Sequence, residues 1–415
     1  MSVLGLPGFD TVPLKSMADI VLGKMLQPQD LRKGDIEVPY LRSASLQDGN
    51  VLDLAGAKTM WASPKEKETM NLRAGDVVVS EGGSVGRAVV LHEDLPGFIF
   101  QNSVNRVRPV NGSDGRYLAY VLTTIRHSGY FSVYCDAVSI AHLTAEKLGR
   151  LRIPAATADI QRRIADYLDR ETATIDALIE KQRELVRHLE ERRVAFRERL
   201  VDEVCAHAAP IAYRRVVTGI RQGWSPQCNN WPAPANVWRV LKVGCVNHGV
   251  FRSNENKELP GNLAPRPETV VRAGELVVSR ANTRELVGSA AAVPEEHPRL
   301  MLSDKLYAIS HSARANSEFM ALVLGTARYR ELIELEATGA SPSMQNISQD
   351  VLLSLPVRLP EVRVQEETVE RWDRETATID ALIAKAERFI ELAQERRAAL
   401  ITAAVTGQIE IPTED

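Results

Sequence analysis

Hydrophobic residues follow two patterns that alternate along the chain. Over residues 157–205, apolar residues recur at intervals of three, four and seven, with Glu, Arg, Lys and Gln between them and no Gly or Pro. This period predicts a long amphipathic helix over Ile175–Val204, roughly 45 Å long, preceded by a shorter helix at Ile160–Leu168. A polar helix with one narrow apolar seam needs a partner helix. The predicted seam consists of Ile160, Ile164, Leu168, Ile175, Leu178, Leu185, Leu189, Phe196 and Leu200.

The segment before this helix, residues 1–156, has the other pattern, and so does the segment after it. Short apolar runs such as Val77–Val79 are separated by turn-forming pairs such as Asp48-Gly49. Runs of this length between turn signals are typical of strands. We predict two short helices in this segment as well, at Tyr117–Ile125 and at Thr144–Leu151, whose first residue caps it.

The chain contains an internal repeat. The sequence DRETATIDALIEK at Asp169–Lys181 recurs as DRETATIDALIAK at Asp373–Lys385, 204 residues later and with one difference in thirteen positions. The strand-rich segments repeat as well, since RAGDVVVS at Arg73–Ser80 matches RAGELVVS at Arg272–Ser279. Repeats of this kind identify duplicated structural units. A second long helix is therefore predicted over 362–406, with Val364, Trp372, Ile379, Leu382, Phe389 and Leu400 in its seam.

These patterns predict an α+β protein in which two homologous β-rich domains alternate with two long helices. The predicted boundaries are 1–156 for the first domain, 157–206 for the first helical spacer, 207–360 for the second domain, 361–407 for the second spacer and 408–415 for a C-terminal tail. Two similar seams in one chain bury each other most simply as an antiparallel coiled coil. Such a pair would relate the two halves by a pseudo-two-fold axis.

Charge is distributed unevenly between the domains and the helices. The chain of 415 residues is 44% hydrophobic and 25% charged, and its net charge is −3. Acidic residues are concentrated in the two helical spacers, while the two domains carry a slight excess of Lys and Arg. A few clustered cations suffice to neutralise DNA phosphates, so this distribution permits DNA binding despite the negative total.

Composition also predicts where the protein resides. The sequence has no run of about 18 apolar residues that would span a membrane. Its N-terminus, MSVLGLPGFDTVPLKSM, lacks the basic and apolar regions of a secretory signal. The cysteines are scattered without metal-ligand spacing, at Cys135, Cys205, Cys228 and Cys245. We therefore predict a cytoplasmic protein with reduced thiols, no metal site and no membrane partner.

Motifs for catalysis are absent from the sequence. The glycine-rich stretch Gly82–Arg87 lacks the GK[ST] ending and the spacing of a phosphate loop. HExxH, GxSxG and dinucleotide-binding patterns do not occur, nor does the Asn-Pro-Pro-Tyr tetrapeptide of adenine methyltransferases. The sequence therefore predicts no catalytic residues in this chain.

The repeated helices resemble a known family. A TxxIDxLI core occurs at Thr172–Ile179 and again at Thr376–Ile383, and each helix begins with a Gln, Gln161 or Gln365. The AAVTGQI ending at Ala403–Ile409 and the Gly223–Pro226 start of the second domain belong to the same pattern. Together these features resemble the specificity subunit of type I restriction–modification enzymes, over essentially the whole chain.

The resemblance implies a non-catalytic protein that selects a DNA sequence. Each β-rich domain would be a target-recognition domain that reads one half of a bipartite site in double-stranded DNA, and the helices would set the spacing between the half-sites. Successive major grooves on one face of DNA lie about 34–36 Å apart, close to the reach of the predicted helix. Expected partners are two modification subunits, which methylate adenine with S-adenosylmethionine, and restriction subunits that use ATP and Mg²⁺. This chain itself would hold no cofactor.

Candidate DNA contacts are cations and amides in the segments where the two domains differ, because such side chains reach both phosphates and base edges. The first domain contributes Lys24, Arg42, Lys65, Lys67, Arg87, Asn102, Asn105 and Arg106. The second contributes Arg221, Lys242, Lys257, Arg280, Asn282, Arg284 and Lys305. The competing interpretation of each residue is a solvated charge or a turn-forming Asn.

Candidate contacts to the modification subunits are the acidic–basic clusters that the helices repeat: Glu191, Arg192 and Arg193, with their copies Glu395, Arg396 and Arg397. Such clusters are otherwise the solvated face of a helix. Two alternative functions stay open from the residues alone. The first is a duplicated scaffold that binds proteins and no DNA, and the second is a fused enzyme whose site has no recognisable motif.

Overall fold

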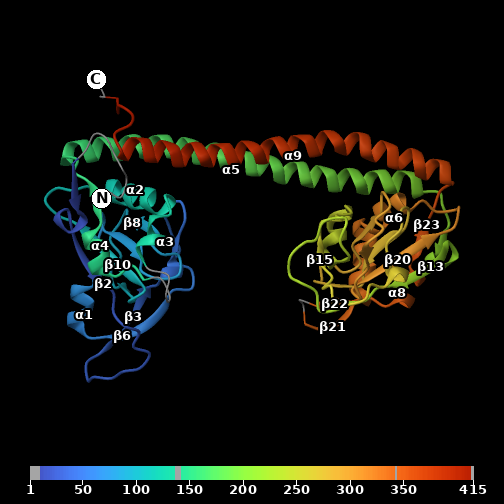
Figure 1. Ribbon diagram of the computed structural model, residues 1–415, viewed down its shortest axis with the longest axis horizontal. Coiled ribbons are helices and arrows are strands. Elements are labelled where there is room, and N and C mark those ends of the chain that lie inside the picture. Colours follow the sequence, from blue (N-terminus) through green and yellow to red (C-terminus); the bar gives the residue numbers. More distant parts are fainter. Residues whose placement is uncertain (1–9, 136–141, 342–343, 413–415) are drawn as a thin grey trace. The chain divides into compact units, whose positions relative to one another are not determined.

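The computed structural model describes residues 10–135, 142–341 and 344–412. The chain divides into two compact units. Unit 1 comprises Met1–Arg183 and Glu387–Asp415, and unit 2 comprises Glu184–Ala386. Each unit contains one β-rich domain, part of the first long helix and part of the second (Figure 1).

The domain of unit 1 is built on a four-stranded antiparallel sheet. Its strands lie in the order β2 (Ala18–Leu22), β10 (Val104–Pro109), β7 (Val77–Ser80) and β8 (Ala88–Val90). Alternate residues of β7 face opposite sides, as the period of two requires. Val77 and Val79 belong to the core that contains helix α2 (Gly115–His127), whereas Val78 packs with Leu41 and Phe100 of a second sheet.

The second sheet consists of β6 (Lys58–Ala62), β3 (Ile36–Leu41) and β9 (Ile99–Phe100), with β3 and β9 parallel. The shorter strands of the unit are β1 (Thr11–Pro13), which pairs with β11 (Arg152–Pro154), and β4 (Leu46–Gln47), which pairs with β5 (Val51–Leu52). Its short helices are η1 (Leu14–Ser16), η2 (Ser43–Ser45), α1 (Pro64–Thr69), α3 (Tyr130–Tyr134) and α4 (Ala145–Arg150). Thr144 caps α4 through its side chain, which confirms the predicted capping.

Unit 2 repeats the strand order of the two main sheets. Its four-stranded sheet has the order β13 (Val217–Gln222), β20 (Leu306–His311), β16 (Leu276–Ser279) and β18 (Ala290–Ala292). Its equivalent three-stranded sheet contains β15 (Asn256–Glu258), β14 (Arg239–Leu241) and β19 (Leu300–Met301), again with one parallel pair. The matching order and direction confirm that the two halves are homologous.

Further elements complete unit 2. The strands are β12 (Pro210–Ala212) with β23 (Pro356–Arg358), and a small sheet of β17 (Ala281–Asn282), β22 (Met344–Asn346) and β21 (Thr338–Ser341). The helices are η3 (Tyr213–Arg215), η4 (Val243–Gly249), η5 (Pro267–Thr269), α6 (Ser317–Leu324), α7 (Ala327–Glu336) and α8 (Gln349–Ser354).

The two long helices are α5 (Ala158–Cys205) and α9 (Val362–Val405). The sequence predicted a short helix followed by a separate long one in the first spacer, and this was wrong. The helix is continuous because no Gly or Pro interrupts it, so nothing in the backbone favours a break after Leu168.

Within unit 1 the long helices pack antiparallel. Ile175 and Ile179 of α5 form a buried cluster with Ala393 of α9. Leu168, earlier in α5, lies in the core cluster that contains Ile401, later in α9. Within unit 2 the direction is again antiparallel, since Phe196 stacks on Trp372 with ring centroids 5.9 Å apart and Val201 shares a core with Val369.

Each repeat supplies an Asp that pairs with an Arg of the other repeat. In unit 1, Arg397 Nε donates to Asp176 Oδ1 at 2.9 Å. In unit 2, Arg193 Nη1 donates to Asp380 Oδ1 at 3.0 Å. Asp176 and Asp380 occupy the same position of the repeat, as do Arg193 and Arg397, so both units have the same helix register.

Part of the predicted seam is exposed. Leu178, Leu185, Leu382 and Phe389 have 43%, 41%, 44% and 41% of their surface accessible, whereas Ile175 and Ile179 are buried. Successive residues are about 100° apart around a helix, so Leu178 projects well to the side of Ile179. The seam that is buried therefore passes through Ile179 and not through Leu178.

A buried Gln joins each long helix to its domain. In unit 1, Gln161 Oε1 accepts from the backbone N–H of Asp114 at 3.0 Å, and its Nε2 donates to Ala156 O at 2.7 Å. In unit 2, Gln365 Oε1 accepts from the N–H of Asn316 at 2.9 Å. Asp114 and Asn316 cap α2 and α6, so both clamps hold the start of a domain helix against the start of a spacer helix.

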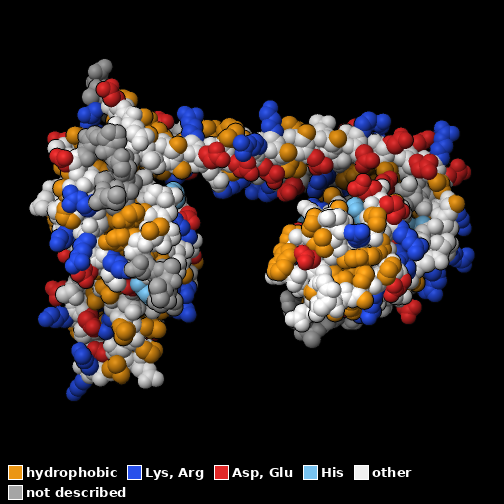
Figure 2. All heavy atoms as spheres, viewed as in Figure 1, with side chains coloured by type: hydrophobic (Ala, Val, Ile, Leu, Met, Phe, Trp, Pro, Cys, Tyr) orange, Lys and Arg blue, Asp and Glu red, His pale blue; other side chains and the backbone are white. Residues whose placement is uncertain are grey.

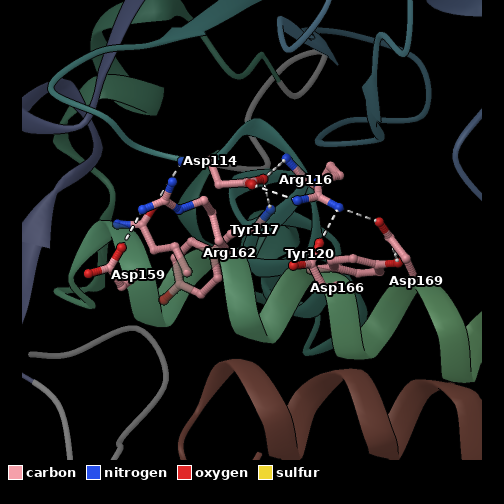
Figure 3. A network of polar contacts seen from close by, with 9 residues as sticks. Asp114, Arg116, Tyr117, Tyr120, Asp159, Arg162, Asp166 and Asp169 are labelled. Carbon is pink, nitrogen blue, oxygen red and sulfur yellow. Dashed lines mark hydrogen bonds and ion pairs between the residues drawn. The ribbon is translucent and has the colours of Figure 1, made fainter. Parts of the chain in front are cut away.

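An ion-pair network reinforces the joint in unit 1 (Figure 3). Arg116 of α2 lies between its own cap, Asp114, and two carboxylates of α5, with distances of 2.9 Å to Asp114, 2.8 Å to Asp166 and 2.9 Å to Asp169. Tyr120 donates to Asp169 at 2.7 Å. Unit 2 has Glu318 at the position of Arg116, where burial and the charge of Asp373 raise the pKa of the Glu318 carboxyl. The joint of unit 2 therefore lacks this attraction.

We predict that Gln365→Leu destabilises unit 2. Gln365 is fully buried, and its loss leaves the Asn316 N–H and the carbonyls of Arg314 and Pro360 without their partner. The free energy of unfolding should fall by about 1–3 kcal/mol, measured from urea-unfolding curves. Gln394→Leu, at an exposed position of α9, is the matched control. Equal unfolding midpoints for the two variants would contradict the clamp.

A second prediction concerns acid stability. Tyr213 Oη lies 2.7 Å from His311 Nε2, and His311 Nδ1 lies 2.8 Å from Ser317 Oγ. Burial lowers the pKa of His311 to about 4. Because an unfolded His titrates near pH 6.5, this residue stabilises the fold fully above pH ~6.5 and loses that contribution as the pH falls toward 4, at most about 1.4 kcal/mol per pH unit.

His311→Gln should therefore flatten the dependence of the thermal midpoint on pH between 6.5 and 4, although it lowers the midpoint itself at neutral pH. Circular dichroism melts at a series of pH values measure the slope. His188→Gln, on the exposed face of α5, should leave the slope as in the wild type. Parallel curves for wild type and His311→Gln would refute the assignment.

Candidate DNA interface

Three loops of unit 1 meet at one end of the four-stranded sheet. They follow β3, connect β7 to β8, and connect β9 to β10. Ser43 Oγ donates to Gly82 O at 2.7 Å, and the Ser43 N–H donates to Ser103 Oγ at 3.2 Å. The Glu81 N–H donates to Ser103 O at 2.9 Å. These bonds hold the loops together as one surface, which includes the predicted contacts Arg42, Arg87 and Asn102.

The equivalent loops of unit 2 also meet. The Arg280 N–H donates to Lys305 O at 2.8 Å. Asn282 Nδ2 donates to Asn247 Oδ1 at 3.3 Å, which links the loop after β16 to the loop after β14. Three of the predicted contacts, Arg280, Asn282 and Lys305, are therefore brought close together, and Lys242 lies at the start of the same β14 loop.

Several of the predicted cations already hold a carboxylate. Lys24 Nζ lies 2.7 Å from Glu66 Oε1, and this hydrogen bond lowers the pKa of the Glu66 carboxyl to about 2. Arg87 Nη2 lies 2.8 Å from Asp48 Oδ2, and Arg126 Nη1 binds the other oxygen of the same carboxylate at 2.5 Å. A DNA phosphate that binds one of these cations would have to replace the carboxylate that now holds it.

Two predicted contacts of unit 1 lie inside the domain. Asn105 is fully buried, and its Nδ2 donates to Leu143 O at 2.8 Å. Arg106 is 3% exposed and donates from Nη1 to the carbonyls of Thr69 and Asn71. Both residues are on β10, the second strand of the sheet, so their side chains are enclosed and serve the fold. The sequence predicts a loop here, so it does not reveal that both side chains are enclosed.

Arg221 of unit 2 also has a structural position. Its Nη2 donates to both carboxylate oxygens of Glu275, at 2.8 and 2.7 Å, and to Val270 O. Arg108 and Asp76 form the equivalent ion pair in unit 1, at 2.7 Å. The ion pair joins a strand of the sheet, β13 in unit 2 or β10 in unit 1, to the turn before β16 or β7. Because Arg221, Asn105 and Arg106 have these structural roles, they are not among the proposed DNA contacts.

The remaining predicted contacts lie at least partly on the surface. Lys65 and Arg284 are exposed, and the Arg284 side chain is 3.5 Å from Glu334. Half-buried positions are occupied by Lys24, Arg42, Lys67, Arg87, Asn102, Lys242, Lys257, Arg280, Asn282 and Lys305. On the helices, Glu191, Arg192, Glu395 and Arg396 are exposed, while Arg193 and Arg397 form the ion pairs between the helices.

Two residues that the sequence analysis missed belong to these loop surfaces. Arg126 lies at the end of α2, and only the fold shows that it shares Asp48 with Arg87. His248 has a positive φ of 62°, an uncommon conformation for a residue with a side chain. It is exposed in the β14 loop beside Asn247. The Asn247-His248-Gly249 sequence is typical of a turn, and it could have indicated that His248 lies in a surface loop.

Among residues 10–135, 142–341 and 344–412, no group of His, Cys, Asp and Glu has the arrangement of a metal site. In the same residues, no helix is long and apolar enough to cross a membrane.

Comparison with known proteins finds a similarity over the N-terminal part of the chain. Residues 7–187 match the family model described as the type I restriction modification DNA specificity domain. Residues 7–187 are therefore similar to the DNA specificity domain of type I restriction–modification systems. This confirms the resemblance inferred from the repeated helices, and it supports neither the scaffold nor the enzyme alternative.

One curated relative of the specificity domain is the type I restriction enzyme EcoEI specificity subunit of Escherichia coli. It is 34% identical over 154 residues, which are 36% of this chain and 26% of the relative. The chain thus matches about a quarter of that relative's length.

Solved structures share the fold. A chain from the study "Structural basis underlying complex assembly and conformational transition of the type I R-M system" has a TM-score of 0.65 and 16% identity, covering 97% of this chain and 99% of its own. The HsdS subunit from Thermoanaerobacter tengcongensis has a TM-score of 0.44 and 18% identity, covering 97% and 98%. The likeness to the first confirms the predicted α+β architecture of two β-rich domains and two long helices.

Proposed function

We propose that this chain is the DNA sequence-specificity subunit of a type I restriction–modification complex. Each unit contributes one target-recognition domain, and each domain reads one half of a bipartite target in double-stranded DNA. The observation that carries the proposal is a duplicated domain whose first copy matches the specificity domain, with the equivalent loops meeting in both copies. The proposed domain limits are those predicted from the sequence, with the long helices as spacers.

In this proposal the chain performs no chemistry. S-adenosylmethionine, ATP and Mg²⁺ belong to partner subunits, and no residue of this chain is assigned to hold them. Two modification subunits methylate adenine, which must leave the base stack to be reached. Restriction subunits are a further expected partner, and the cytoplasm is the expected location.

The proposed base and phosphate contacts are the surface residues of the two loop clusters. Arg280 and Asn282 are the strongest pair, because they lie two residues apart directly after β16, with Asn282 on β17, and favour guanine and adenine edges respectively. Lys305 lies against the same segment through its carbonyl. Cations at this position contribute affinity for any duplex through phosphate neutralisation.

Mobility-shift assays of duplex DNA, with and without the modification subunits, test the proposal. Methylome sequencing of a host that carries the complete system should first reveal a bipartite, adenine-methylated motif, and that motif supplies the duplex. Binding of this duplex in preference to a scrambled one supports the proposal. Failure to bind any duplex in either condition would overturn it.

We predict that Arg280→Ala relaxes recognition of one half-site only. Loss of a bidentate contact to guanine should cost about 1–3 kcal/mol of discrimination at one position of the motif. Methylome sequencing of the variant measures the change in both half-sites. Arg328→Ala, at an exposed cation of α7 that is not among the proposed contacts, serves as the control. Uniform weakening at all sequences would instead identify a phosphate contact.

Docking of the modification subunits is assigned to the exposed members of the repeated clusters. Because Arg193 and Arg397 hold the helix pairs together, the test uses Glu191→Lys with Arg192→Glu and the same changes at Glu395 and Arg396. We predict that the fourfold variant keeps its helicity and assembles less with the modification subunit on size-exclusion chromatography. Full assembly would contradict this docking surface.

A further inference from the structure

Each domain presents a loop between its first long strand and the next one, and both loops begin in the same way. The loop of unit 1 covers residues 23–35 and that of unit 2 covers 223–238. Both start with a glycine that passes close to another backbone. A Cβ on Gly23 would lie 2.2 Å from Gln101 O, and one on Gly223 would lie 2.0 Å from Leu302 O.

The residues after the two glycines make equivalent hydrogen bonds. The Lys24 N–H donates to Phe100 O at 2.9 Å, and the Trp224 N–H donates to Leu302 O at 3.0 Å. The two loops are therefore the same element of the duplicated domain, although their sequences share little beyond the glycine.

Both loops expose large apolar side chains. In unit 1, Met25 and Leu31 are 75% and 72% accessible, and in unit 2 Trp231 is 56% accessible. Figure 2 shows exposed hydrophobic side chains over the part of unit 2 that carries β15. Burial of a large aromatic ring by a partner would provide favourable free energy, so the exposed Trp231 offers a contact surface.

The exposed indole of Trp231 is held in place by strand β15. Trp231 Nε1 donates to Glu258 Oε2 at 2.8 Å, and the Glu258 N–H donates to Trp231 O at 3.2 Å. On either side, the Asn229 N–H donates to Glu258 O at 3.1 Å and the Ala233 N–H donates to Asn256 Oδ1 at 2.8 Å. The side chain is thus pre-organised, and since its N–H is already bonded, the ring offers only its apolar face.

The same loops are connected to the cationic loop clusters. In unit 2, Gln222 Nε2, one residue before the loop, donates to Asp304 O at 2.8 Å, and Arg280 Nη1 donates to the same carbonyl at 3.4 Å. In unit 1, the Asn102 N–H donates to Lys24 O at 2.9 Å. A duplex that contacts the loop clusters is therefore adjacent to the base of each apolar loop.

We propose that the 223–238 loop packs the ring of Trp231 against nucleobases of the target DNA. This inference rests on the proposed function. The occupant is DNA because the loop is continuous with the cationic surface and occurs once in each recognition domain. Aromatic rings stack on bases of any sequence, and apolar side chains act as wedges between base steps or contact thymine methyl groups.

The test measures the dissociation constant for duplex DNA at a series of salt concentrations. It uses the complex of the full chain with its modification subunits and the duplex whose motif methylome sequencing reveals. Trp231→Ala should raise the dissociation constant about tenfold at every salt concentration, with an unchanged slope against log[salt], because a ring releases no counterions. Trp231→Phe should bind within about threefold of the wild type, because it keeps an aromatic face.

Two control variants accompany this measurement. Leu335→Ala removes an apolar side chain of α7 that is 79% accessible, and it should leave the dissociation constant unchanged. Lys305→Ala removes a proposed phosphate contact and should reduce the salt slope by about one. Thermal melts of the Trp231 and Leu335 variants should match that of the wild type, since both side chains are largely exposed.

The outcomes separate this inference from the function on which it rests. If the wild type binds no duplex, the proposed function fails. If the wild type binds and Trp231→Ala binds equally well, the function stands and the role of Trp231 is refuted. If Trp231→Ala instead fails to assemble with the modification subunit on size-exclusion chromatography, the loop contacts protein, and the inference is again refuted.

Discussion

The structure depends on the burial of one apolar seam on each long helix. Most helical stability in proteins comes from tertiary packing of an amphipathic face. Each fully buried Ile or Leu contributes roughly 1.5–3 kcal/mol, so the few that lie in the seam decide whether the pair forms. Within each unit the partner is the other copy of the repeat, which explains why the sequence DRETATIDALI is identical in the two copies.

The register of the helix pair follows from charges as well as from packing. Asp176 and Arg397 in unit 1 repeat the pairing of Asp380 and Arg193 in unit 2. Exposed ion pairs are worth little by themselves. A slip by one turn, about 5.4 Å, within either unit would nevertheless separate the ion pair of that unit and misplace its buried apolar residues. The pairs therefore specify one alignment among several that the apolar stripe alone would tolerate.

The domains are attached to this helix pair by polar contacts that only partly agree between the two units. Both units use a buried Gln that binds the cap of a domain helix. Only unit 1 adds the network of Arg116 with the two helix carboxylates, because unit 2 has Glu318 instead. Both units thus keep the buried Gln, because a buried polar group without a partner costs free energy. The units differ at the solvent-accessible ion pairs, because the loss of such a pair costs little.

The sequence by itself determined the duplication, the long helices and the resemblance to type I specificity subunits, because helix periodicity and a repeated motif are local properties of the chain. It also predicted the turn residues and the strands that both halves share. Tertiary structure decided which of these residues face solvent. Arg106 lies in the interior while Arg280 lies at a loop surface, and both were equivalent cations in the sequence. Leu178 and Ile179 are adjacent and equally apolar, yet only packing against a partner helix buries one of them. Exposure depends on contacts between residues far apart in the chain, and no pattern within one segment contains that information.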